Sequence, residues 1–142
     1  MNGNTAIPLL YTFRRCPYAM RARMALCLSG IDIACREIDL KHKADAFLAT
    51  SSKGTVPVLV LENGDVIDES LDIVAHACQH EPRLALTTEQ DSHYQALLTE
   101  LSNLFIPALN RIKYSTRYEN VDRATELATA QRFCHQLEQQ LK

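Results

Sequence analysis

One cysteine lies where a strand is expected to end and a helix to begin, a position suited to nucleophilic chemistry. Cys16 stands in the segment RRCPYAMR, directly before a proline. Because proline is favoured in the first turn of a helix, Cys16 is expected to precede a helix N-terminus. The unpaired N–H groups and the helix dipole stabilise a thiolate there, and the thiolate is the reactive form of cysteine. The competing interpretation is a small buried side chain, as many free cysteines are.

The residues around Cys16 indicate which kind of thiol chemistry to expect. The cations nearest in sequence are Arg14, Arg15, Arg21 and Arg23, and they are expected to favour the thiolate further. Ala19 occupies the position where a CxxC pair would have its second cysteine. A CxxC pair resolves a mixed disulfide within the chain, whereas a lone cysteine needs an external thiol. The sequence therefore predicts monothiol chemistry with a small free thiol as partner.

The composition argues against several other kinds of protein. The chain has 142 residues and a formal net charge of -2, which does not suit a nucleic-acid-binding surface. Its 5 cysteines form no CxxC or CxxH pair, so neither a disulfide framework nor a zinc site is expected. No apolar run reaches about 18 residues, the length of a membrane span. With no recognisable signal peptide, we expect a cytoplasmic protein that binds no membrane.

The pattern of apolar residues predicts the elements that position Cys16. A buried strand is expected over 7–13, a helix from Pro17 that ends before Gly30, and a second, parallel strand over 31–40. This is half of a βαβ unit. The apolar face predicted for the helix consists of Met20, Met24, Cys27 and Leu28, which are spaced three and four residues apart.

The following segment completes a small mixed sheet. A short helix is expected in 41–50, a third strand over 56–61, and a fourth strand at 66–67. Between the last two, Asn63-Gly64 favours a type I′ hairpin turn. A helix from 69 to about 80 follows. The order predicts an α/β fold, a thioredoxin-like four-stranded mixed sheet with helices on both faces. The predicted anchors of the short helix are Ala46, Phe47 and Leu48.

The remaining chain is predicted to be helical. Residues 1–81 are assigned to the thioredoxin-like domain, 82–90 to a linker, and 91–142 to a short all-helical region of two helices. Pro107 is expected to kink the first of these two helices.

Three segments, YTFRRCPYAMRARMAL, KGTVPVLV and DES, resemble the glutathione transferase superfamily. The cysteine and its CPYA context are most similar to omega-like and glutaredoxin-like members. The resemblance is strong over residues 7–80 and weaker over 90–142. Members of the family continue through several more helices, so the helical domain looks truncated. Two amphipathic helices would leave an apolar stripe exposed, which predicts self-association or poor solubility, with a homodimer as the expected assembly.

The resemblance implies a role for particular residues. Cys16 is implied as the catalytic residue. Val56, followed by a cis Pro57, is implied to pair with the cysteinyl part of glutathione. The residues implied to bind glutathione are Tyr18, Lys43, Val56, Pro57, Glu69 and Ser70.

Glutathione has two charged ends, and the resemblance assigns residues to both. Glu69 and Ser70 are implied to hold the γ-glutamyl end, and Lys43 the glycyl carboxylate. The backbone of Tyr18 is implied to approach the sulfur. Taken alone, Lys43 would be a surface lysine, the DES segment an ordinary helix cap at Asp68 or Ser70, and Pro57 an edge-strand proline.

The implied function is glutathione-dependent thiol transfer or reduction through a mixed disulfide on Cys16. Glutathione would be the co-substrate, with no metal or bound organic cofactor. The other substrate would be a small disulfide or a glutathionylated molecule. Two alternatives stay open: conjugation of glutathione to a small electrophile, and a non-enzymatic, glutathione-binding regulatory module that binds a protein partner.

Overall fold

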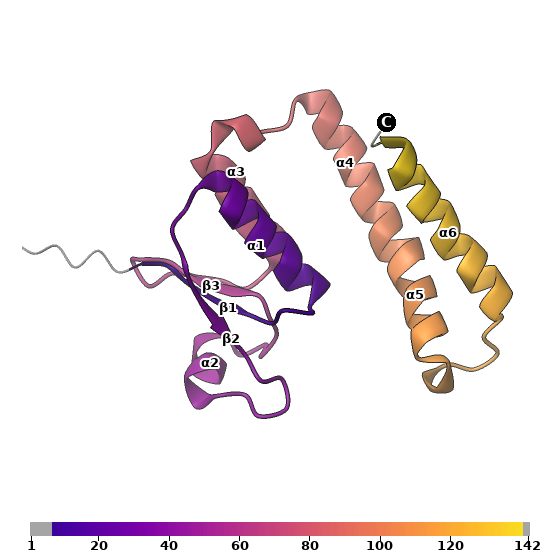
Figure 1. The fold of residues 1–142 in the computed structure, drawn as a ribbon, viewed down its shortest axis with the longest axis horizontal. Helices are drawn as coiled ribbons and strands as arrows, with labels where there is room; N and C mark the ends of the chain where they lie inside the picture. The colour runs from indigo at the N-terminus through magenta and orange to yellow at the C-terminus, as the bar shows by residue number, and fades with distance from the viewer. Residues whose placement is uncertain (1–6, 141–142) are drawn as a thin grey trace, which may run out of the picture. The chain divides into compact units, whose positions relative to one another are not determined.

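The computed structural model describes residues 7–140. The chain divides into two compact units, Met1–Ala85 and Leu86–Lys142. The first unit holds the sheet and three helices, and the second is helical (Figure 1).

The first unit is built on a four-stranded mixed sheet. Its strands are β1 (Leu9–Thr12), β2 (Ala34–Glu37), β3 (Val58–Val60) and β4 (Val66–Ile67), in the spatial order β2-β1-β3-β4. Strand β1 runs parallel to β2 and antiparallel to β3, and β4 is antiparallel to β3. This is the predicted thioredoxin-like arrangement, although each of the first three strands is shorter than the sequence suggested.

Helices cover both faces of this sheet. They are α1 (Pro17–Ser29), α2 (Asp45–Thr50) and α3 (Ser70–His80), followed by a single 3-10 turn, η1 (Pro82–Leu84). Neighbouring residues of a strand point to opposite faces, so β1 contributes to two cores. Leu10 packs with α1 and α3, and Tyr11 packs with α2 on the other face. The first core consists of Leu10, Ala22, Leu26, Leu59, Ile73 and Ala77.

The face that α1 buries differs from the predicted one. Met24 is 64 % exposed and Leu28 is 62 % exposed, whereas Ala19, Ala22 and Leu26 are fully buried. Small alanine side chains let a helix approach its neighbours closely, so α1 packs through its alanines. The larger apolar residues, which share the same helical spacing, are left on the outside.

The hairpin between β3 and β4 also departs from the prediction. A type I′ turn requires positive φ at both central residues. Among residues 7–140 the only non-glycine residue with positive φ is Asn120, so Asn63 does not meet this requirement. Gly64, with φ of +90°, instead donates its N–H to Leu61 O at 2.9 Å. The loop is therefore a longer one, in which the glycine alone adopts the left-handed conformation.

Helix α2 is anchored by one side chain. Phe47 is fully buried, and its ring centre lies 5.3 Å from that of Tyr11. Of the other two predicted anchors, Leu48 is 43 % exposed and Ala46 is also exposed. A helix of six residues can turn only one side toward the sheet, and Phe47 occupies it.

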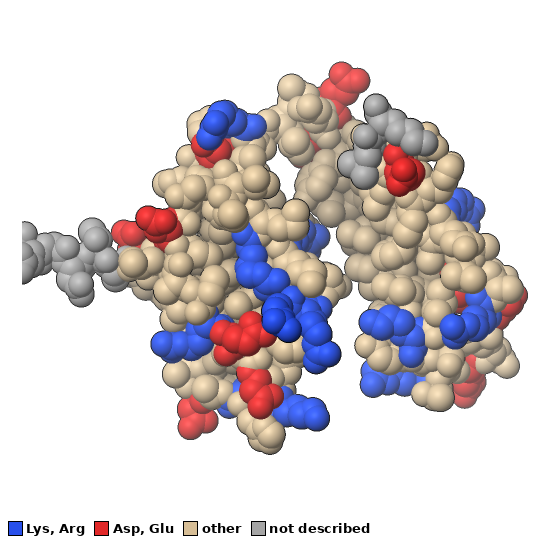
Figure 2. All heavy atoms as spheres, viewed as in Figure 1, with Lys and Arg blue, Asp and Glu red and all other residues tan. Residues whose placement is uncertain are grey.

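The surface of the first unit carries charges of both signs. In Figure 2, Lys and Arg atoms form a run over this unit, and Asp and Glu atoms lie between them. Contacts between opposite charges accompany this mixing. Arg83 pairs with Glu81 at 2.8 Å, and Lys53 pairs with two carboxylates at the start of α3.

The second unit begins with a long helical stretch. Helix α4 (Thr88–Glu100) passes through a π-helical turn, η2 (Leu101–Phe105), into α5 (Ile106–Lys113). After a short turn, η3 (Ser115–Arg117), the chain forms α6 (Arg123–Gln140). Thr87 and Gln90 form a capping box, which explains why α4 begins at Thr88. Pro107, where a kink is predicted, lies in the first turn of α5, and the π-helical turn ends two residues before it.

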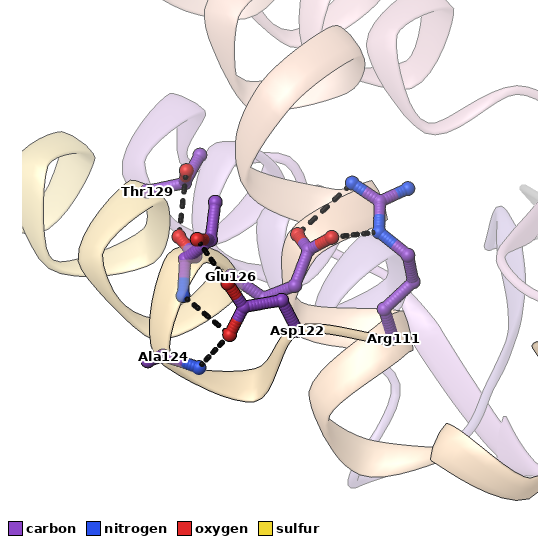
Figure 3. Close-up of polar contacts among 6 residues, drawn as sticks. Arg111, Asp122, Ala124, Glu126 and Thr129 are labelled. Carbon is purple, nitrogen blue, oxygen red and sulfur yellow. Dashed lines mark hydrogen bonds and ion pairs between the residues drawn. The ribbon is translucent and has the colours of Figure 1, made fainter. Parts of the chain in front are cut away.

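The helices of the second unit are held together by a small apolar core and an ion pair. The rings of Phe105 and Phe133 are 5.1 Å apart, and Ala108 is fully buried. Arg111 on α5 pairs through two nitrogens with Glu126 on α6, as Figure 3 shows. These contacts connect α5 to α6.

Asp122 defines the start of α6. Its carboxylate accepts hydrogen bonds from the N–H of Ala124 at 3.0 Å and from the hydroxyl of Thr125 at 2.6 Å (Figure 3). The hydrogen bond from the Thr125 side chain is the largest cause that holds the pKa of Asp122 below its ordinary value. A carboxylate at this position also compensates the positive end of the helix dipole. Within residues 7–140, no helix combines the length and the apolar character that crossing a membrane would need.

Candidate functional site

A cavity of about 500 Å³ in the first unit gathers every site residue predicted from the sequence. Its walls come from the start of α1, the loop before α2, the loop before β3 and the start of α3. This volume lies in the range typical of small-molecule sites. The lining residues are Cys16, Tyr18, Leu40, Lys43, Gly54, Thr55, Val56, Pro57, Asp68, Glu69 and Ser70.

Cys16 occupies the N-cap position of α1. Its backbone is extended, and its N–H donates to Phe13 O at 3.0 Å. The side chain caps no N–H of the helix. The sulfur instead lies 3.7 Å from Val56 O, a long contact in which the thiol donates. A partly buried sulfur at a helix N-terminus is placed where an anion is stabilised by the helix dipole.

Val56 offers its backbone to the cavity. The Val56–Pro57 peptide bond is cis, as the resemblance implies. Pro57 precedes β3, which is an inner strand, so the interpretation as an edge-strand proline is wrong. Among residues 7–140, no backbone group pairs with the N–H or C=O of Val56. A peptide that lies along this residue therefore finds an N–H with no backbone partner and a carbonyl oxygen that the Cys16 thiol contacts at 3.7 Å.

The first turn of α3 has no side-chain cap. Glu69 is the N-cap residue, and its side chain makes no capping hydrogen bond. The interpretation of DES as an ordinary cap through Asp68 or Ser70 is therefore wrong. Uncapped N–H groups at a helix N-terminus suit a carboxylate. Ser70 is 5 % exposed, and its hydroxyl oxygen accepts a hydrogen bond from Arg21 Nη2 at 2.6 Å.

Lys53 neutralises part of the acidic charge at this helix start. Its Nζ lies 2.7 Å from Glu69 Oε1 and 3.1 Å from Asp68 Oδ1. The hydrogen bond to Glu69, followed by that to Asp68, raises the pKa of Lys53 above its ordinary value. Ser51 also donates its hydroxyl to Asp68 at 3.3 Å. One oxygen of Glu69 is thus already engaged by a cation of the chain itself.

Lys43 also lines the cavity, next to Gly54. Gly54 has φ of +58°, a conformation that favours glycine. A Cβ atom on this residue would stand 3.6 Å from Lys43 Nζ and 3.2 Å from Leu48 Cδ2. The glycine therefore gives room both to the lysine side chain and to α2.

The arginines near Cys16 in the sequence, which are predicted to favour its thiolate, contact other groups in the structure. Arg23 donates to Thr12 Oγ1 at 2.6 Å and to Arg14 O at 3.1 Å, which holds the loop between β1 and α1. Arg15 lies over the ring of Phe13 at 5.4 Å. None of the four arginines lines the cavity in the described part of the chain.

Several cavity residues were missed by sequence reasoning. Gly54, Thr55 and Asp68 belong to the same short motifs as predicted residues, so the motifs themselves were the signal. Lys53 begins the KGTVPVLV segment and pairs with Glu69 without lining the cavity, whereas Leu40 carried no pattern that marks it. Arg21 was noted only as a charge near Cys16, because its contact with Ser70 joins residues far apart in the chain.

Comparison with known proteins points to one family. Residues 10–89 match the family model described as the glutathione S-transferase N-terminal domain. The maleylacetoacetate isomerase of Pseudomonas aeruginosa is 32 % identical over 82 residues, which are 54 % of this chain and 39 % of that protein. Pig glutathione S-transferase omega-1 is 31 % identical over 104 residues, 72 % of this chain and 43 % of that protein. This chain thus spans less than half the length of these two relatives.

The solved structure of glutathione transferase Omega 3C from Trametes versicolor has the same fold. Its TM-score is 0.76 at 22 % identity, over 90 % of this chain and 59 % of that one. The family match covers the whole segment that carries the cavity, from Cys16 to Ser70. The chain belongs to the glutathione transferase superfamily, and omega-class members are among the proteins to which it is similar.

Proposed function

We propose that the cavity binds glutathione and that Cys16 carries out glutathione-dependent thiol transfer through a mixed disulfide. One observation supports this above the others. The Cys16 sulfur lies 3.7 Å from the carbonyl oxygen of Val56, and within residues 7–140 no backbone group pairs with Val56. A cysteinyl residue paired with Val56 would bring its own sulfur close to that of Cys16.

The charged and polar groups of the cavity suit the two ends of glutathione. Glutathione is a tripeptide with a central thiol, a carboxylate at each end, and an ammonium group at its γ-glutamyl end. Lys43 provides a cation for the glycyl carboxylate. The uncapped start of α3, with the Ser70 hydroxyl, suits the γ-glutamyl carboxylate, and Glu69 can accept from the ammonium group. Tyr18 lines the wall beside the sulfur.

The reaction proceeds by two thiol–disulfide exchanges. The Cys16 thiolate attacks the glutathionyl sulfur of a mixed disulfide between glutathione and another thiol. This step forms the Cys16–glutathione disulfide and releases the other thiol as a thiolate, which then takes up a proton. The thiolate of a second glutathione then attacks the glutathionyl sulfur of this mixed disulfide. Oxidised glutathione leaves and Cys16 returns as a thiolate. Overall, the glutathionylated substrate and one glutathione give the free thiol and one molecule of oxidised glutathione.

A lone cysteine favours reduction over conjugation. It forms a stable covalent bond with glutathione, whereas conjugation requires only that the glutathione thiolate be held and activated. The scheme uses glutathione as a co-substrate and calls for no metal or bound organic cofactor. Conjugation to an electrophile and non-enzymatic binding are the alternatives that the test must separate. A homodimer and a cytoplasmic location stay predictions.

The test compares the wild type with Cys16→Ser in the glutathione-dependent reduction of a glutathionylated small thiol. Cys27→Ser serves as the matched control, because Cys27 is an exposed cysteine on the same helix and does not line the cavity. We expect turnover in the wild type and in Cys27→Ser, and none in Cys16→Ser. Mass spectrometry of the wild type is expected to find the glutathionyl adduct on Cys16.

Each other outcome points to one alternative. Conjugation of an electrophile that survives in Cys16→Ser would replace thiol transfer with conjugation. Binding of glutathione without turnover of either substrate would favour the regulatory module. A folded wild type that does not bind glutathione would refute the proposal altogether.

A further inference from the structure

One arginine of α1 reaches the first residue of α3. Arg21 Nη2 donates to Ser70 Oγ at 2.6 Å, across 49 residues of sequence. Ser70 lines the cavity, whereas Arg21 does not. The guanidinium thus reaches the cavity through residues that line it, and its hydrogen bond is to the serine hydroxyl.

The direction of this hydrogen bond decides what Ser70 can do. A serine hydroxyl has one hydrogen to donate and two lone pairs that accept. The guanidinium has only donors, so in this contact the serine must accept. The hydroxyl hydrogen is therefore left for another partner. With Ser70 at the uncapped start of α3, that partner is an acceptor inside the cavity, and a carboxylate is the acceptor that a helix N-terminus favours.

The placement of Arg21 leaves one of its own donors without a partner. Within residues 7–140, Nε of Arg21 is buried and has no hydrogen-bond partner. The guanidinium carbon lies 5.6 Å from the centre of the Tyr18 ring, within the distance of a cation–π contact. A buried donor without a hydrogen-bond partner destabilises the folded state, so its retention indicates a role beyond stability. Arg21 is thus held between two residues that line the cavity, at a cost to its own hydrogen bonding.

A purely architectural role explains these contacts less well. Helices α1 and α3 are already packed together through Ala22, Leu26, Ile73 and Ala77. A further tie between them at Ser70 adds little to that apolar contact. The charge of the guanidinium, in contrast, polarises the hydroxyl and makes it a stronger donor to an anion.

We propose that Arg21 is a positioning residue that makes Ser70 a dedicated donor to the α-carboxylate of the γ-glutamyl group. The inference rests on the proposed binding of glutathione in this cavity. Arg21 then increases the affinity only for ligands that have this carboxylate, and does not contribute to the affinity for every ligand of the cavity. Removing the arginine should therefore penalise ligands that have the carboxylate and spare ligands that lack it.

The test measures the affinity of two peptides by calorimetry on the full chain. One is S-methylglutathione, whose blocked sulfur prevents exchange with Cys16. The other is the same molecule without the α-carboxylate, γ-aminobutyryl-S-methylcysteinylglycine. We expect Arg21→Met to weaken S-methylglutathione about tenfold, the loss of one hydrogen bond to a charged group. The affinity for the second peptide should change by less than about twofold.

Two further variants separate positioning from folding. Arg21→Lys keeps a cation and one donor, and is expected to retain part of the preference for the carboxylate. In Ser70→Ala the arginine has no hydroxyl to orient. Adding Arg21→Met to this variant should therefore reduce the affinity for S-methylglutathione little further. Arg23→Met is the matched control, because it removes another hydrogen-bonded guanidinium of α1 whose contacts lie on the preceding loop. It is expected to leave the ratio of the two affinities unchanged.

The outcomes that overturn the inference are distinct from those that overturn the proposed function. If Arg21→Met weakens both peptides equally, the arginine is only structural. Additive losses in the Arg21→Met/Ser70→Ala variant would likewise refute positioning through the hydroxyl. If the wild type binds neither peptide, the glutathione site itself is refuted, and the role of Arg21 with it.

Discussion

Phe47 is the side chain on which α2 depends, and its truncation tests how the cavity wall is supported. It is fully buried and packs against Tyr11, on the sheet face that also carries Val56 and Val58. In the sequence, helix α2 lies between Lys43 and Gly54, and both of these residues line the cavity. Leu48 is the neighbouring residue on the same helix, and it is 43 % exposed.

The two residues are expected to differ severalfold in their contribution to stability. Replacing a buried phenylalanine by alanine removes its apolar surface from the core and leaves a cavity, at a cost of about 3–5 kcal/mol. Fully burying a leucine contributes about 1.5–3 kcal/mol. Because Leu48 keeps 43 % of its surface in solvent, Leu48→Ala should cost only about 1 kcal/mol.

Urea denaturation of the two alanine variants measures this difference. Phe47→Leu is included because it removes less of the buried side chain than Phe47→Ala and leaves a smaller cavity, so that a folded variant is available if Phe47→Ala does not fold. Equal losses for Phe47→Ala and Leu48→Ala would refute the reasoning, since the two side chains would then be equally anchored. A larger loss of unfolding free energy in Leu48→Ala than in Phe47→Ala would also refute it.

Three further predictions concern backbone conformation, charge and pH. Gly64 has φ of +90° and nothing within 4 Å of a Cβ atom, so Gly64→Ala should lose about 1–2 kcal/mol in urea denaturation through its backbone alone. Lys53→Met frees one oxygen of Glu69, which can then accept from the α-ammonium group of the ligand. The ratio of the affinities for S-methylglutathione and for its analogue without the α-amino group should therefore increase. An unchanged ratio in calorimetry would contradict this. Hydrogen bonds from Arg83 lower the pKa of Glu81 from 4.5 to about 2, so the stability that they contribute is present above pH 4.5 and lost as the pH falls toward 2. The Tm advantage of the wild type over Arg83→Met should shrink across that window, and a constant difference would speak against the assignment.

Local signals in the sequence were sufficient to place the elements around the sulfur. The Cys16-Pro17 pair and Gly30 gave the two ends of α1, because proline and glycine restrict the backbone through their own covalent structure. The order of elements then allowed few arrangements of the sheet. The resemblance added the cis bond at Pro57, which spacing alone does not indicate.

Burial and long-range polar contacts were harder to predict. Met20 and Met24 have the spacing of a buried stripe, yet α1 packs through Ala19 and Ala22, and spacing cannot tell which of two usable faces will be covered. The hydrogen bond between Arg21 and Ser70 depends on how α1 and α3 pack, so neither residue reveals it.

The π-helical turn at Leu101–Phe105 affects how this chain is aligned with its relatives. An α-helix advances about 100° per residue, so one extra residue in a wide turn rotates everything after it by that amount. A relative whose helix lacks the turn requires a one-residue gap within this segment. Without the gap, the fully buried Ala108 would be matched to the wrong helical position, and every later residue of α5 would inherit the error.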